Sequence, residues 1–304
     1  MPDSLLSSGG VPIAYRDLGG PGPSLLLLHG AGGNLAQLTT LAEELRQAYR
    51  VVTVDLRGHG RSGDGPWRWD EVLDDLAAVA DGLGLDRPAV VGVSLGGMLA
   101  ALWAQRHPEC PGVVSLDGNP PPSRPEHLAG MDPGQAAAAL AKLRAAFDGM
   151  AAMLAEPLTA EQLAAALAGQ RAMALRYGAD PADWVAAFER NLVPGDDGRY
   201  RLRPDPTVTG QLREAMESLD LVPAYRDARC PLLLVLATED LPEQEPFHEV
   251  YVAYRRATLE RLATVDGPHL RVLPLAGASH AMVAERPAEL AAIVTDFLHE
   301  AAHG

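Results

Sequence analysis

Six runs rich in leucine and β-branched residues recur along this 304-residue chain, separated by longer stretches with helical periodicity. The runs are Ser24–His29, Val51–Asp55, Pro88–Val93, Gly112–Asp117, Pro231–Ala237 and Leu270–Leu275. Apolar strands that alternate with helices form a mostly parallel sheet covered on both faces. Apolar residues recur with the helical period over 72–83 and 290–298, so we expect both segments to pack on that sheet. A break at Gly9-Gly10 predicts an antiparallel hairpin over 5–17.

The alternation of strands and helices stops after the fourth run and resumes before the fifth. The intervening segment is too long for an unstructured loop in a compact domain. Its sequence predicts helices, one of which begins with a capping box formed by Thr159 and Gln162. We therefore predict a core of residues 1–119 and 229–304, and a helical cap of residues 120–228. The cap would lie at the carboxyl ends of the strands, where ligands bind in open α/β sheets.

Charge and composition exclude several kinds of partner. The chain has 40 acidic and 25 basic side chains, a formal charge of −15 and no dense cluster of Lys and Arg. Nucleic acids and anionic membranes attract basic patches, so neither is an expected partner. The longest apolar run, 89–104, is too short to cross a bilayer. The first ten residues do not resemble a signal peptide and the two Cys are far apart, so we expect a cytoplasmic protein of undetermined oligomeric state.

Ser94 lies between Gly92 and Gly96, at the end of an apolar strand and the start of a helix that runs to about His107. A tight strand-to-helix turn would project the Ser94 side chain from the sheet. Side chains at the two flanking glycine positions would collide with neighbouring backbone. At the helix N-terminus, the backbone N–H of Leu95 would be free to stabilise an oxyanion. This pattern predicts a nucleophilic serine.

With this turn, the segments Leu28–Asn34 and Asp55–Ser62 make the chain resemble the α/β-hydrolase superfamily everywhere outside the insertion. The resemblance implies the α/β-hydrolase fold, a mostly parallel central sheet flanked by helices, with the cap inserted after the strand that ends near Asp117. It also implies that the loop after His29 donates the second oxyanion N–H, from Ala31. We interpret His29 itself as a histidine that orients this loop.

Gly58-x-Gly60-x-x-Gly63, which begins in the second of these segments and ends one residue after it, matches the dinucleotide-binding fingerprint. Residues 64–66, Asp-Gly-Pro, follow it in place of a helix, so no helix N-terminus is available for a pyrophosphate. We interpret the match as a turn-rich loop. The sequence has no Cys/His cluster or metalloprotease motif either, and we expect neither a cofactor nor a metal.

A nucleophilic serine needs a general base and an acid that orients the base. His280 follows the last strand and has the superfamily's position for the base, and the chain order Ser, acid, His fits the fold. Two carboxylates could be the acid. Asp240 follows the strand that most often supplies the acid in this superfamily. Asp117 lies at the end of the preceding strand, which supplies the acid in some members. We expect Asp240, with Asp117 as the alternative.

The cap is rich in Met and Ala, and Met adapts its shape to bulky apolar ligands. The residues expected to contact a small-molecule substrate are Gly32, Met150, Met153, Trp184 and Tyr251. Ordinary packing is the alternative explanation: among helices for the methionines and Trp184, and on the sheet for Tyr251.

The leading hypothesis is a serine hydrolase that cleaves a carboxylic ester (class EC 3.1.1) or lactone of a small, largely apolar molecule through an acyl-enzyme on Ser94. The same triad could instead hydrolyse a C–C bond or modify a polyketide-like metabolite. A third hypothesis is a non-enzymatic member of the fold that binds a small molecule. An intact nucleophile, base, acid candidate and oxyanion loop are more than binding requires, which favours an enzyme.

Overall fold

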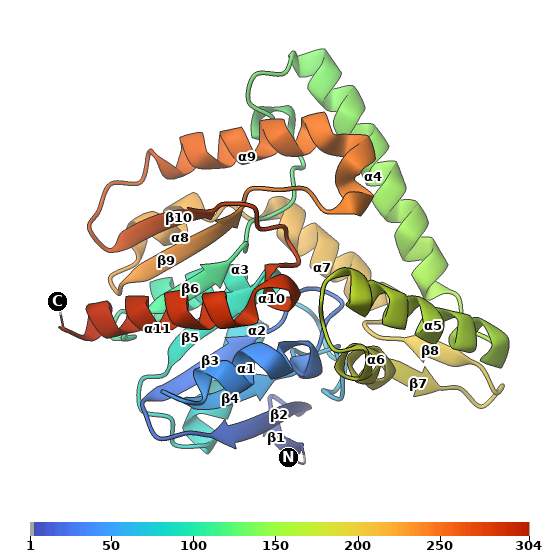
Figure 1. The fold of residues 1–304 in the computed structure, drawn as a ribbon, viewed down its shortest axis with the longest axis horizontal. Coiled ribbons are helices and arrows are strands. Elements are labelled where there is room, and N and C mark those ends of the chain that lie inside the picture. Colours follow the sequence, from blue (N-terminus) through green and yellow to red (C-terminus); the bar gives the residue numbers. More distant parts are fainter. Residues whose placement is uncertain (1–2, 304) are drawn as a thin grey trace.

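Eight strands form one sheet in the computed structural model, which describes residues 3–303 (Figure 1). The strands are β1 (Ser4–Ser8), β2 (Val11–Gly19), β3 (Ser24–Leu28), β4 (Arg50–Val54), β5 (Ala89–Val93), β6 (Val113–Leu116), β9 (Leu232–Ala237) and β10 (Leu270–Leu275). Their order is β1-β2-β4-β3-β5-β6-β9-β10. β1 and β2 form an antiparallel hairpin at one edge, and the other six strands are parallel to one another. The six predicted strands and the hairpin are confirmed, and Met1 and Pro2 lie outside the described residues.

Helices cover both faces of this sheet because its strands are apolar on both sides. Leu26 and Leu28 of β3 belong to one buried cluster, together with side chains from α2 (Trp69–Gly82) and α3 (Leu95–Arg106). Leu25 and Leu27 belong to a second cluster, with side chains from α1 (Thr39–Leu45) and α11 (Pro287–His303). The alternation along β3 is the period-2 pattern expected of a strand that is buried on both faces. The predicted helices at 72–83 and 290–298 are thus confirmed as α2 and α11.

The segment between β6 and β9 is mainly helical. Its elements are the short turn η2 (Pro125–His127), α4 (Pro133–Ala155), α5 (Ala160–Arg176), α6 (Pro181–Arg190), β7 (Leu192–Pro194), β8 (Tyr200–Leu202), α7 (Pro206–Ser218) and α8 (Val222–Asp227). Both hydrogen bonds of the predicted capping box between Thr159 and Gln162 are present at the start of α5. The hairpin of β7 and β8 was not expected, because strands of three residues leave no readable period.

The inserted segment, residues 120–228, does not pack as one unit. Val208 and Leu212 of α7 and Tyr225 of α8 join the buried cluster of α2 and α3. By contrast, α4 packs its N-terminal half on α9 (His248–Leu262) through a separate small cluster. In Figure 1, α4 runs along one side of the molecule from α9 toward α5, away from the sheet. Among residues 3–303, no helix is both long and apolar enough to span a membrane.

Candidate functional site

Ser94 and Asp117 lie side by side at the carboxyl edge of the sheet. Val93 of β5 pairs with Leu116 of β6, so each residue follows directly after a paired position. The N–H of Ser94 donates to the carbonyl of Leu116 at 2.9 Å, and the N–H of Asp117 donates to the carbonyl of Val235 in β9 at 2.7 Å. Neighbouring strands are about 4.8 Å apart, so the two side chains start from adjacent points.

The backbone of Ser94 has φ 52° and ψ −114°, a conformation that L residues rarely adopt. The close turn depends on the flanking glycines. A Cβ at Gly92 would lie 1.9 Å from the carbonyl oxygen of Gly96, and a Cβ at Gly96 would lie 2.5 Å from that of Leu28. The predicted strand-to-helix turn is therefore present, and a strained backbone of this kind is common at functional sites.

His280 faces Asp117. Its Nδ1 donates to Oδ2 of Asp117 at 2.6 Å, while Oδ1 of Asp117 accepts from the N–H of Ala237 at 3.0 Å. Asp117 also has a positive φ of 51°, so the backbone turns sharply at the end of the strand. Burial alone would lower the pKa of His280, but the hydrogen bond and negative charge of Asp117 outweigh it and raise the pKa above its ordinary value.

Asp240 does not pair with His280, so the expected partner is corrected to the alternative, Asp117. Oδ2 of Asp240 accepts from Nδ1 of His248 at 2.5 Å, and Oδ1 pairs with Arg255. Both partners are on α9. The physical reason lies in the chain after β9, where the N–H groups of Thr238 and Glu239 donate to the Ala278 carbonyl at 2.9 and 3.0 Å. That connection ties the two loops together, and Asp240, which follows it, pairs with α9 instead of His280.

The loop that carries His280 is braced by residues that sequence reasoning missed. Oγ of Ser279 donates to Oε1 of Glu285 at 2.7 Å, and Nη1 of Arg286 donates to the carbonyl of Ala276 at 3.0 Å. Glu285 ends the short helix α10 (Met282–Glu285). The adjacent charges of Glu285 and Arg286, five and six residues after His280, were a signal in the sequence.

The turn Gly30–Gly33 contains Ala31, whose N–H is predicted to be an oxyanion donor. The Gly30 carbonyl accepts from the N–H of Gly33 at 3.0 Å and from Nδ1 of His29 at 2.7 Å. Nε2 of His29 in turn accepts from the N–H of Leu56 at 3.0 Å. Burial lowers the pKa of His29, so its ring is neutral and serves as one donor and one acceptor. These contacts confirm that His29 orients the loop.

A trans peptide points its N–H opposite its carbonyl, so fixing the Gly30 carbonyl also fixes the direction of the Ala31 N–H. Among residues 3–303, neither this N–H nor that of Leu95, the first residue of α3, has a hydrogen-bond acceptor. Two backbone donors are therefore free at the edge of the sheet that bears Ser94.

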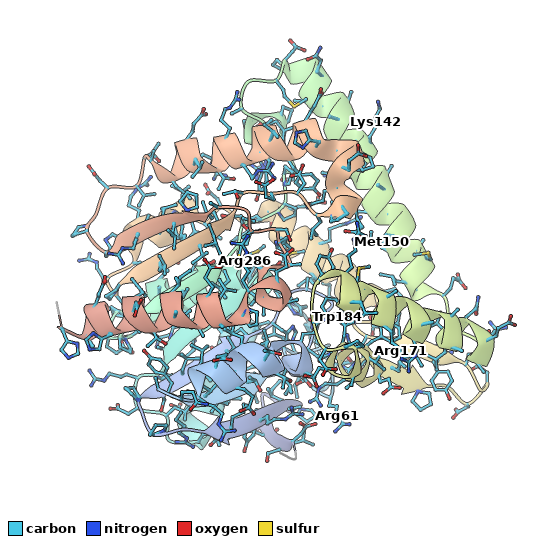
Figure 2. All side chains as sticks on the ribbon, in the orientation of Figure 1. Arg61, Lys142, Met150, Arg171, Trp184 and Arg286 are labelled. Atoms are coloured by element: carbon cyan, nitrogen blue, oxygen red, sulfur yellow. The ribbon has the colours of Figure 1, made fainter. Side chains whose placement is uncertain are left out.

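Met150 and Met153 lie on the C-terminal half of α4, where their side chains are 52% and 67% exposed. Figure 2 labels Met150 on this helix, near the neighbouring α5. The structure leaves both side chains open to solvent, without enclosing them in a pocket. Their contact with substrate stays a prediction.

The other expected substrate contacts divide into packing residues and one residue of the oxyanion turn. Trp184 donates to Oε1 of Gln170 at 2.8 Å and stacks on Tyr177 at 5.9 Å between ring centroids, so it joins α6 to α5. Tyr251 packs against the small cluster between α4 and α9. Gly32 is exposed in the turn next to Ala31. Trp184 and Tyr251 thus have packing partners, those of Tyr251 on α4 and α9 and not on the sheet, and substrate contact by all three residues stays a prediction.

The glycine-rich loop after β4 has the form of consecutive turns. Gly58 and Gly60 have φ of 77° and 50°, and the next helix, α2, begins only at Trp69. No helix N-terminus follows Gly63, in agreement with our interpretation of this motif as a loop. Within the described part of the chain, no group of three or more His, Cys, Asp and Glu side chains is placed to hold a metal ion.

Comparison with known proteins gives matches along nearly the whole chain. The model of the alpha/beta hydrolase family matches residues 25–293. The 2-(acetamidomethylene)succinate hydrolase of Mesorhizobium japonicum is 28% identical over 294 residues, which cover 95% of this chain and 92% of that protein. The pimeloyl-(acyl-carrier protein) methyl ester esterase of Aliivibrio fischeri is 41% identical over 96 residues, but these cover only 31% of this chain and 36% of the esterase.

Solved structures share the same architecture. The crystal structure of E-2-(acetamidomethylene)succinate hydrolase has a TM-score of 0.71 and 24% identity, covering 98% of each chain. A thioesterase domain from the curacin biosynthetic pathway has a TM-score of 0.67 and 19% identity, covering 97% of this chain and 99% of that domain. These likenesses, with the eight-stranded sheet, confirm the predicted α/β-hydrolase fold. Because the family model matches residues 25–293, most of the chain, this chain belongs to the alpha/beta hydrolase family.

Proposed function

We propose that this protein is a serine hydrolase that cleaves a carboxylic ester or lactone through an acyl-enzyme on Ser94. The observation that carries the proposal is the hydrogen-bonded pair of His280 and Asp117 at the strand end beside Ser94. A histidine held by a carboxylate next to a serine in a strained turn is the arrangement that activates a serine hydroxyl. Relatives named as hydrolases and esterases support the reaction class.

In this mechanism, Oγ of Ser94 attacks the substrate carbonyl while Nε2 of His280 accepts the hydroxyl proton. Asp117 stabilises the resulting imidazolium, and the N–H groups of Ala31 and Leu95 bind the oxyanion. Collapse of the tetrahedral intermediate breaks the bond to the alkoxide, which takes the proton from His280. A water molecule then attacks the acyl-enzyme with His280 as general base, which releases the carboxylic acid and restores Ser94.

We further propose that residues 120–228 act as a cap that selects the substrate. Four large apolar side chains on the C-terminal half of α4 are exposed, namely those of Phe147, Met150, Met153 and Leu154. Exposed apolar groups that gather on one helix are typical of a ligand-binding or docking surface. An apolar acyl or alcohol portion would find its contacts there.

A second candidate is the hydrolysis of a 2-(acetamidomethylene)succinate. The relative with that name aligns with 95% of this chain, including the inserted segment, whereas the match to the methyl ester esterase covers less than a third. The same serine, histidine and aspartate would serve this reaction.

A substrate panel tests the proposal and separates these candidates. The purified protein is assayed with p-nitrophenyl esters of graded acyl length, with lactones, with a C–C-cleavable β-diketone and with 2-(acetamidomethylene)succinate. We expect turnover of esters or lactones, with longer acyl chains preferred to acetate because the exposed α4 side chains are apolar. Turnover of the β-diketone or of 2-(acetamidomethylene)succinate with no ester or lactone hydrolysis would contradict the proposal.

The pH dependence of kcat/KM should reveal the raised pKa of His280. The base must be neutral, so kcat/KM should fall as the pH drops, with a midpoint above the ordinary histidine value of 6.5. The same raised pKa stabilises the fold fully below the unfolded-state value, and this stabilisation is lost as the pH rises through the folded-state pKa. An NMR titration of His280 in Ser94→Ala protein measures the pKa directly, and a value at or below 6.5 would contradict the pairing with Asp117.

A further inference from the structure

The side chain of Asn191 reaches from the inserted segment to the oxyanion turn. Asn191 follows α6 directly and is only 5% exposed. Its Nδ2 donates to the Gly32 carbonyl at 2.8 Å, and its Oδ1 accepts from the N–H of Gly60 at 3.1 Å and from Nδ2 of Asn34 at 3.0 Å. One amide thus joins three points of the core.

The turn that receives this contact has little packing of its own. Ala31 and Gly32 are exposed, Gly32 has φ +69°, and a Cβ built on Gly32 would meet no atom within 4 Å. Hydrogen bonds to the two carbonyls that flank Ala31 and Gly32 therefore have to hold the turn. His29 and Gly33 hold the Gly30 carbonyl, and Asn191 holds the Gly32 carbonyl.

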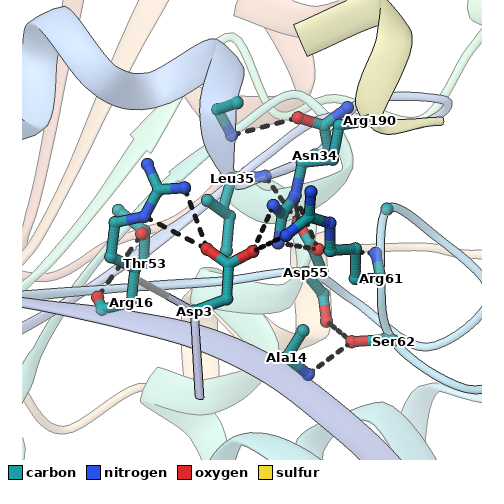
Figure 3. A network of polar contacts seen from close by, with 12 residues as sticks. Asp3, Ala14, Arg16, Asn34, Leu35, Thr53, Asp55, Arg61, Ser62 and Arg190 are labelled. Carbon is teal, nitrogen blue, oxygen red and sulfur yellow. Dashed lines mark hydrogen bonds and ion pairs between the residues drawn. The ribbon is translucent and has the colours of Figure 1, made fainter. Parts of the chain in front are cut away.

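Buried charges fix the end of α6, from which Asn191 extends. Arg190 donates from Nη2 to Oδ2 of Asp55 at 2.7 Å and from Nη1 to Oδ2 of Asp3 at 2.6 Å (Figure 3). The side chains of Arg190 and Asp55 are 5% and 0% exposed. An unpaired charge in a buried site is strongly unfavourable, so this pairing gives the end of α6 a defined position against the core. Nδ2 of Asn34 adds a bond to the Ala187 carbonyl at 2.7 Å.

A cavity of about 440 Å³ borders this network, and its lining includes Asp3, Arg16, Arg61 and Arg190. Its lining includes none of Ser94, Asp117 and His280. The three arginines that reach the cavity already pair with Asp3. The ion pairs of Arg190 with Asp3 and Asp55 therefore anchor the inserted segment on the core. This segment contacts the oxyanion turn through Asn191.

We propose that Asn191 is a positioning residue through which the inserted segment holds the Ala31 N–H toward the oxyanion. This inference rests on the proposed function. A donor that is held in place before the reaction stabilises the charge that develops in the transition state, and it adds little to ground-state binding. Loss of the Asn191 contact should therefore lower kcat and leave KM nearly unchanged.

The test compares Asn191→Asp and Asn191→Ala with wild-type protein on one ester. Asn191→Asp keeps the shape and the acceptor oxygen, but an ionised carboxylate cannot donate to the Gly32 carbonyl. We expect kcat to fall by about 10- to 100-fold in both variants. This loss does not exceed the loss that follows removal of an oxyanion donor.

Gln211→Ala is the matched control. Oε1 of Gln211 accepts from the N–H of Trp67 at 2.8 Å, which is also a contact between the inserted segment and the core. This control should keep the wild-type kcat.

Protonation provides a rescue that depends on the hydrogen bond donated to the Gly32 carbonyl, and the split between kcat and KM in folded protein separates positioning from a structural role. The neutral carboxyl of Asn191→Asp can donate to the Gly32 carbonyl, and burial raises the pKa of such a group. The ratio of kcat for Asn191→Asp to kcat for wild type should therefore rise between about pH 8 and about pH 5. If Asn191→Ala does not fold, Asn191→Asp at acidic pH still makes the comparison, since its neutral form is isosteric with the amide.

The possible failures are distinguishable. Labelling of wild-type Ser94 by a fluorophosphonate with an unchanged kcat in both folded Asn191 variants would overturn the positioning role alone. A rise in KM with kcat unchanged would overturn it as well, because that pattern indicates lost substrate binding. Absence of both labelling and ester turnover in wild-type protein would overturn the proposed function itself.

Discussion

Ser94→Ala protein should lose ester hydrolysis by about 10⁶-fold in kcat, the loss seen when the nucleophile of a serine hydrolase is removed. The hydroxyl oxygen of Ser94 forms the bond to the acyl group in the proposed mechanism, and the alanine side chain has no nucleophile. The fold should persist, because the turn depends on Gly92 and Gly96 and not on the hydroxyl. Stopped-flow and steady-state assays with the best ester of the panel measure the loss.

Ser218→Ala serves as the control for this substitution. Ser218 ends α7 on the surface, where its Oγ donates only to the Ala215 carbonyl at 3.1 Å. The control should hydrolyse the ester at the wild-type rate. Activity retained in Ser94→Ala protein, above the level of a mock purification, would show that hydrolysis does not proceed through Ser94.

Asp117→Asn should lower kcat by about 10⁴-fold, as the same change does in a serine protease triad. The Asn carbonyl oxygen can still accept from the N–H of Ala237. Its NH₂ group would then face Nδ1 of His280 and favour the tautomer that cannot accept the Ser94 proton. The loss should appear in kcat and kcat/KM together, since the contact acts in the transition state.

Asp240→Asn is the matched comparison, because it makes the same change in the other strand-end carboxylate. Asp240 holds His248 and Arg255 of α9, so its loss should affect the anchoring of that helix and leave kcat close to wild type. The pairing that we assign would be wrong if Asp240→Asn abolished turnover while Asp117→Asn retained it. A thermal melt of both variants separates loss of activity from loss of fold.

The sheet could be predicted because its strands are continuous apolar runs, and the turn at Ser94 could be predicted because only glycines fit on either side of it. His280 followed from its place after the last strand. The choice between Asp117 and Asp240 could not be made from the sequence. Both follow apolar strands, and the difference lies in the positive φ of Asp117 and in the bonds from Thr238 and Glu239 to Ala278.

The inserted segment was predictable as helices but not as a set of contacts. The capping box of Thr159 joins residues that are three positions apart, so it can be recognised in the sequence. Asn191 and Arg190 act across about 130 or more residues of chain, on Gly60, Gly32 and Asp55. Such long-range partners leave no periodicity. The packing of α8 on the core was hidden for the same reason, because its buried Tyr225 has no distinguishing pattern in the sequence.

The central claim, an acyl-enzyme on Ser94, is tested most directly by mass spectrometry after treatment with a fluorophosphonate. Such a reagent phosphonylates only an activated serine, releasing fluoride. We predict one adduct per chain, mapped to the peptide that contains Ser94, with no adduct in Ser94→Ala and much slower labelling in Asp117→Asn. An unmodified Ser94 in folded wild-type protein, or an adduct that persists in Ser94→Ala, would contradict the account.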